Sequence, residues 1–165
     1  MNIIVKTILI GIGATFTMDI WAYLLRFFNI KSLDYRFLGR WIGNIPKGKF
    51  FHNKIFNTPP VRNELITGWI AHYLIGISFA VLLVLVYGKE WLDEPTFYPA
   101  LIIGVTTIVA PLFIMQPAFG IGIASSKLPA PNTARFKSLC THTIYGVGLY
   151  ATALLVKYVS TLLIS

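Results

Sequence analysis

Residues 65–88 are LITGWIAHYLIGISFAVLLVLVYG and contain no Asp, Glu, Lys or Arg. A helix needs about 20 apolar residues to cross the hydrocarbon core of a bilayer, so this stretch is long enough by itself. Two more stretches, Pro95 to Ser126 and Ser138 to Val156, also lack these residues, and Ile8 to Met18 reaches the length once Asp19 is included. The sequence therefore predicts an all-α, polytopic membrane protein, a bundle of four transmembrane helices.

The composition supports the same class of protein. Hydrophobic residues make up 56% of the 165 residues and charged residues only 12%, whereas about a quarter of the residues in a soluble domain are charged. The single Cys140 excludes an intramolecular disulfide, and no cleavable signal peptide is expected. The net charge of +8 comes from basic residues mixed with aromatic ones. That mixture is typical of headgroup contacts, so we do not expect a nucleic-acid partner.

A single transmembrane domain, 1–165, is expected, with helices at about 3–27, 59–87, 96–116 and 132–163. The connection 28–58 is predicted to lie at the cytoplasmic interface. In it Leu33, Phe37 and Trp41 recur at helical spacing, which predicts a short amphipathic helix lying on the membrane surface. Such a helix would anchor the chain, or alternatively cover the helix ends as a lid.

Basic residues predict the orientation of the chain. Eight lie in or beside the first connection and three in the third, whereas only Lys6, Lys89 and Lys157 belong to the other face. The positive-inside rule then places both basic loops in the cytoplasm and both termini outside.

The second and fourth predicted helices share a pattern of a small residue, a histidine and a glycine. Gly68, His72 and Gly76 align with Ser138, His142 and Gly146. Small residues four apart let a neighbouring backbone approach closely, so each histidine is expected between two helix-packing positions. The pattern favours two helical hairpins related as a parallel repeat; chance similarity of apolar helices is the alternative.

Four polar residues are predicted to lie at one depth in the cytoplasmic half of the bundle. Asp19 precedes Arg26 by seven residues, His72 follows Glu64 by eight, and His142 follows Lys137 by five. Gln116 stands at the cytoplasmic end of the third helix. The positions agree within about one helical turn. Supporting side chains are expected from residues nearby: Thr15, Tyr23, Tyr73 and Tyr145.

Three chemistries suit such a group; binding of a metal ion or haem is the first hypothesis, and proton-coupled transport is the alternative. Asp19, His72, His142 and Gln116 are suitable ligands for a transition metal. Two facing histidines could instead hold a haem axially. An Asp and His pair is also a natural proton relay for a small transporter or channel-like protein, most simply an oligomer.

A structural role is the further alternative, because each residue alone could be a satisfied interhelical hydrogen-bonding group. The chain would then serve as an accessory subunit of a membrane complex. No nucleophile–base triad, nucleotide loop or metalloprotease motif occurs, so the sequence assigns no enzyme class.

The motifs Thr15-x-x-Met18-Asp19, His72-x-x-x-Gly76, Gln116-Pro117 and His142-x-x-Tyr145-Gly146 resemble those of a family of small bacterial inner-membrane proteins of unknown function. The resemblance extends over nearly the whole chain. It implies a four-helix membrane protein in a bacterial inner membrane, and it brings no activity, cofactor or catalytic residue.

Overall fold

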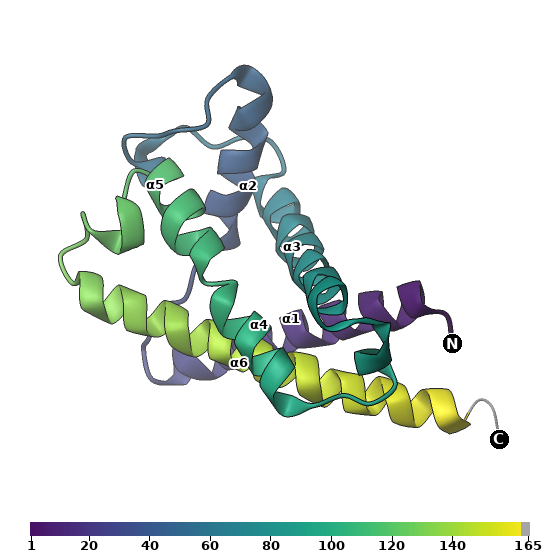
Figure 1. Ribbon diagram of the computed structural model, residues 1–165. Coiled ribbons are helices and arrows are strands. Elements are labelled where there is room, and N and C mark those ends of the chain that lie inside the picture. Colours follow the sequence, from purple (N-terminus) through teal and green to yellow (C-terminus); the bar gives the residue numbers. More distant parts are fainter. Residues whose placement is uncertain (163–165) are drawn as a thin grey trace. The chain divides into compact units, whose positions relative to one another are not determined.

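The computed structural model describes residues 1–162, and every regular element in that range is helical (Figure 1). The α-helices are α1 (Ile3–Phe27), α2 (Tyr35–Asn44), α3 (Glu64–Tyr87), α4 (Phe97–Thr106), α5 (Gln116–Ala118) and α6 (Pro131–Leu162). Shorter helical turns lie between them: η1 (Ile45–Lys47), η2 (Ile55–Asn57), η3 (Lys89–Leu92), η4 (Pro111–Met115) and η5 (Ile123–Ser125). The predicted all-α fold is confirmed.

Four segments are long and apolar enough to cross a membrane: Ile3–Phe27, Glu64–Tyr87, Phe97–Ala118 and Pro131–Leu162. Large apolar side chains remain exposed along them, among them Leu85 at 76% and Phe27 at 68%. An apolar surface of this extent is suited to lipid, because in water it would favour aggregation. The four predicted spans are therefore confirmed as candidate membrane helices.

The second and third spans differ in detail from the predicted ranges. Helix α3 begins at Glu64 and not at Pro59, because Asn63 adopts a left-handed conformation with φ of 58° and breaks the helical path. The third span is not one regular helix either. Pro111 lacks an N–H group, and the chain forms the wide π-helical turn η4 from that residue before α5 begins.

The predicted helix in the first connection exists as α2, and it packs through other residues than Leu33, Phe37 and Trp41. Leu33 precedes the helix and is exposed, and Phe37 and Trp41 are only half-buried. The buried residues of α2 are Leu38, Gly39, Arg40 and Asn44. Helix α2 thus packs on the rest of unit 2 through a glycine and a paired arginine, and its predicted place at the membrane surface stays a prediction.

The described chain divides into two compact units. Unit 1 comprises residues 1–31, 73–107 and 140–162, and unit 2 comprises residues 32–72 and 108–139. Helices α3 and α6 each contribute to both units.

Unit 1 has an apolar core and close helix crossings. One cluster holds its buried apolar side chains: Ile10, Ala14, Ala80, Leu83, Trp91, Leu92, Ala100, Ile103, Tyr145, Leu149, Ala153 and Val156. Gly104 of α4 meets Gly146 of α6 so closely that a Cβ on Gly104 would overlap the Gly146 backbone. Lys6 pairs with Asp93 at 2.6 Å and Lys157 with Glu94 at 2.8 Å. The start of α1 and the end of α6 are thus tied to the same turn.

Unit 2 is organised around an ion pair between α2 and the first residue of α3. Arg40 donates to Glu64 through Nε at 2.9 Å and Nη2 at 2.8 Å, and both side chains are largely buried. Gly39 lies against the Glu64 carbonyl, with no space for a side chain. Arg40 Nη1 also donates to the Thr58 carbonyl at 2.8 Å, so one guanidinium joins α2, α3 and the loop between them.

Candidate functional site

The acidic residue of the first span lies within unit 1 and has a partner on another helix. Tyr73 Oη of α3 donates a hydrogen bond to Asp19 Oδ2 of α1 at 2.9 Å. Both side chains are half-buried. An acidic side chain in a spanning helix is expected to turn away from lipid and towards such a partner.

The pair follows from the antiparallel packing of α1 against α3. Gly11 lies against Ile77, and one turn further Thr15 lies against Gly76, where a Cβ would overlap its hydroxyl. Asp19 follows one turn later, opposite Tyr73. Thr15 is fully buried and donates to the Gly11 carbonyl at 2.8 Å. Small residues along this stripe therefore set the distance at which the acid and the phenol meet.

The predicted supporting residue Tyr23 lies elsewhere. Its side chain is 60% exposed, and its ring packs edge-on against Phe27 at 5.2 Å between centroids. The structure thus gives Tyr23 a surface position typical of an interfacial aromatic residue.

The histidine of the last span also lies in unit 1 and contacts a threonine that the sequence interpretation missed. His142 Nδ1 is 2.9 Å from Thr107 Oγ1. The same hydroxyl donates to the Gly104 carbonyl at 2.6 Å. Since a threonine hydroxyl has one hydrogen, it accepts from His142, which must carry its proton on Nδ1. Nε2 of the neutral ring is then the acceptor.

Tyr145 and the glycines near it form packing contacts in unit 1. Tyr145 is fully buried and donates to the Gly76 carbonyl at 2.6 Å. Thr15 of α1 and Tyr145 of α6 therefore both contact Gly76. Together with Gly146 at the crossing with Gly104, these residues hold α3, α4 and α6 close to one another.

The other histidine of the motif, His72, lies in unit 2 within an aromatic cluster. Tyr35 Oη is 2.9 Å from His72 Nε2, and the two rings stack at 4.3 Å between centroids. Trp69 packs edge-on against Tyr35. Gly68 permits this contact, because a Cβ there would overlap the Tyr35 carbonyl. Ser138, its counterpart in the predicted repeat, is half-buried on α6.

Gln116 stabilises a turn of unit 2. It is 6% exposed, and its Oε1 accepts a hydrogen bond from Ser125 Oγ at 2.9 Å. Ser125 itself is in the left-handed conformation with φ of 61°. The Gln116 carbonyl accepts from Ile121 N at 3.1 Å. The amide therefore compensates for strained backbone in the connection that follows α5.

The four residues predicted to share one site each have a separate partner: Asp19 with Tyr73, His72 with Tyr35, Gln116 with Ser125 and His142 with Thr107. Within residues 1–162, no three His, Cys, Asp or Glu side chains form a group that could hold a metal ion. The predicted metal centre is therefore not supported, because its expected ligands bind hydroxyl groups of their own neighbours. The sequence pattern found the ionisable residues, but neither Tyr35, in the connection, nor Thr107, in an apolar span, gives a signal of its own.

Comparison of the sequence with models of protein families identifies a family. A family model described as a protein of unknown function (DUF2938) matches residues 8–156. No curated protein and no solved structure matches the chain.

Proposed function

Since the chain belongs to the DUF2938 family, which is described as being of unknown function, we infer its function from its own polar contacts. We propose that it is a small proton-conducting membrane protein that moves protons through Asp19 and Tyr73. One observation carries this proposal, the 2.9 Å hydrogen bond between these two side chains on two apolar helices. Ionisable residues inside spanning helices are by default functional.

The chemistry of the pair suits repeated proton exchange. An ionised carboxylate accepts the phenol hydrogen, whereas a protonated carboxyl can donate to the phenol oxygen after the hydroxyl turns. The interhelical hydrogen bond is thus available in both protonation states. The contact of His142 with Thr107 has the same property, because Nδ1 carries a proton in the neutral and in the charged ring. The Asp19–Tyr73 and His142–Thr107 hydrogen bonds are thus compatible with uptake of a proton.

The proposal includes a setting. Eleven of the 14 Lys and Arg residues belong to the first and third connections, and this asymmetry favours a cytoplasmic position for both and an external one for the termini. We place the protein in the inner membrane of a bacterium on the motifs described above. Water would reach the polar side chains first from one face of the membrane and then from the other, or along the axis of an oligomer.

Proton flux into liposomes tests the proposal. The purified chain is reconstituted with a pH-sensitive dye inside, and a potassium gradient with valinomycin drives protons inward. We expect flux above that of empty liposomes, loss of that flux in Asp19→Asn, and a partial loss in Tyr73→Phe. Glu90→Gln is the matched control, since it removes the same charge from an exposed side chain of the turn that forms no ion pair with the described residues.

Two outcomes would refute the proposal: wild-type flux equal to that of empty liposomes, or equal flux from wild type and Asp19→Asn. A lower stability of Asp19→Asn without any flux to lose would favour the role of a structural subunit. The absorption spectrum and metal content of the same preparation, beside His72→Ala and His142→Ala, test the haem and metal alternatives.

A further inference from the structure

The segment from α2 to the start of α3 carries an uncompensated positive charge. Residues 35–63 contain six Lys and Arg residues and no Asp or Glu. Arg36 pairs with Asp34 and Arg40 with Glu64, which flank the stretch. Lys49 and Lys54 form no ion pair with any residue that the structure describes. The middle of the loop is therefore available for an anion.

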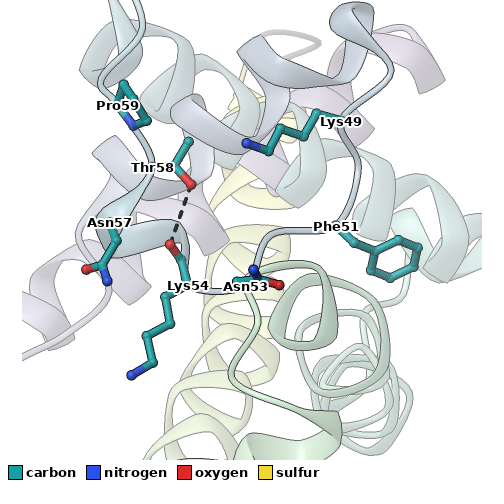
Figure 2. A pocket seen from close by; sticks show the side chains of 7 residues that line it. All are labelled: Lys49, Phe51, Asn53, Lys54, Asn57, Thr58 and Pro59. Atoms are coloured by element: carbon teal, nitrogen blue, oxygen red, sulfur yellow. Dashed lines mark hydrogen bonds between the residues drawn. The ribbon is translucent and has the colours of Figure 1, made fainter.

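These two lysines line an open cavity at the surface of unit 2, and all but one of its lining residues are exposed. Its volume is about 740 Å³, and its lining includes Lys49 and Lys54, the amides Asn53 and Asn57, and the hydroxyl residue Thr58. Figure 2 shows the Lys49 ammonium group pointing towards Thr58, while the ring of Phe51 points away from it. The Thr58 hydroxyl donates to the Lys54 carbonyl at 3.5 Å. The cavity thus offers ammonium and amide donors and no carboxylate, a donor set that matches an oxyanion.

The walls of the cavity are held in place by contacts outside it. Arg40 Nη1 fixes the Thr58 carbonyl at 2.8 Å, and Trp41 Nε1 fixes the Phe50 carbonyl at 2.9 Å. His52 N donates to the Ala118 carbonyl at 2.8 Å, and Ile55 N to the Phe119 carbonyl. A loop bound at so many points pays little conformational entropy when it binds a ligand.

His52 contacts the lining residue Thr58 and provides no negative charge. It is 5% exposed, and its Nδ1 is 3.0 Å from Thr58 Oγ1. Its Nε2 is buried without a hydrogen-bond partner in the described chain. Burial, together with the nearby Lys49 cation, lowers the pKa of His52. The imidazole is therefore neutral near pH 7, and the charge of the cavity comes from its lysines.

We propose that this cavity binds the phosphate group of an anionic phospholipid at the membrane surface. Phosphate is the chemistry that its donors recognise, and the surroundings indicate a lipid as its source. Phe51 is 70% exposed and Phe56 is 47% exposed beside the two lysines, as expected of side chains that enter the headgroup region. The loop also leads directly into the apolar helix α3. Anionic lipids enrich the cytoplasmic leaflet, where the basic loops are predicted to lie.

Native mass spectrometry of the full chain in a neutral detergent tests this assignment. The probes are dihexanoyl phosphatidylglycerol, dihexanoyl phosphatidylcholine and inorganic phosphate, each titrated against wild type. The variants are Lys49→Gln, Lys54→Gln and the double variant, all at exposed side chains. Lys47→Gln is the matched control, because it removes the same charge from the same loop at an exposed position outside the cavity lining.

We expect one phosphatidylglycerol per chain, with weaker binding of phosphatidylcholine. Each lysine substitution should weaken that binding about fivefold, and the double variant should weaken it roughly 25-fold. Lys47→Gln should change it less than twofold. If inorganic phosphate binds with the same dependence on the two lysines and phosphatidylglycerol does not bind, the proposal of a lipid ligand is refuted. The ligand is then a free anion. Absence of binding, or an equal loss in Lys47→Gln, would overturn the cavity itself.

Discussion

Replacement of Arg40 by methionine is the perturbation with the largest expected effect on unit 2. The side chain donates to the Glu64 carboxylate and to the carbonyls of Ile55 and Thr58. Methionine fills a similar volume but donates no hydrogen bond. Glu64 is then left with the Val61 N–H at 3.1 Å as its remaining hydrogen-bond partner in the described chain.

The expected loss is about 3 kcal/mol of unfolding free energy, the lower end of the range of about 3–5 kcal/mol for breaking one side of a buried ion pair. The lower end applies because the Glu64 side chain is 12% exposed and can reach water once Arg40 is gone. Arg40→Lys should lie between wild type and Arg40→Met. Lysine restores the charge, but its ammonium cannot reproduce the planar fork that spans three partners.

The measurement is unfolding in mixed micelles with increasing dodecyl sulfate, followed by circular dichroism. Arg36→Met is the control, since Arg36 forms a comparable ion pair with Asp34 but its side chain is 59% exposed. Exposed pairs contribute little, so its unfolding midpoint should stay near that of wild type. Equal midpoints for Arg40→Met and Arg36→Met would refute the claim that burial makes the Arg40 pair important.

Two more predictions concern a histidine and a glycine. Because burial and the Lys49 cation lower the pKa of His52 below its ordinary value of 6.5, the unfolded chain binds more protons than the folded chain below that pH. Unfolding free energy should therefore fall as the pH drops below 6.5, and fall less in His52→Gln; parallel pH profiles would contradict this. Gly146→Leu should lower stability by about 1–3 kcal/mol, because the α4 backbone at Ala100 and Leu101 lies about 3.0 Å from where its Cβ would be. Val147→Leu at an exposed neighbour should not lower it. Similar melting temperatures for these two variants would be evidence against the close crossing.

The spans could be predicted from the sequence because length and charge alone define them. Helix α1 (Ile3–Phe27) has the bounds that the apolar pattern predicts, and the others agree within a few residues. The start of α3 could not be predicted in the same way. Proline is common at the start of a helix, so Pro59 and Pro60 favour a start there. The left-handed conformation of Asn63 instead decides where the helical path begins.

Helix α2 shows why an apolar pattern predicts a helix better than its buried face. Gly39 is buried because the Glu64 carbonyl occupies the space of its missing side chain. Arg40 is buried because Glu64 neutralises it. Both facts depend on the first turn of α3, more than 20 residues away, and neither residue type indicates burial by itself.

The candidate site was predictable in its ionisable residues and unpredictable in its partners. Asp19 stands out because a carboxylate in an apolar span is costly, and its face of α1 follows from helical spacing. Depth along each helix does not give rotation about its axis or the distance between helices. The sequence therefore does not predict Thr107 as the partner of His142. That contact depends on the close crossing of α4 and α6 at Gly104 and Gly146.

The two ion pairs that lysines form with the acidic turn after α3 have a practical consequence for determining topology. Lys6 and Lys157 hold the beginning of the first span and the end of the last one against Asp93 and Glu94. A reporter domain near Asn2, an epitope after Leu162 and a labelled cysteine in the turn must all face the same compartment. A single chain thus supplies three independent readings of its sidedness, and any disagreement among them would expose a misinserted fusion.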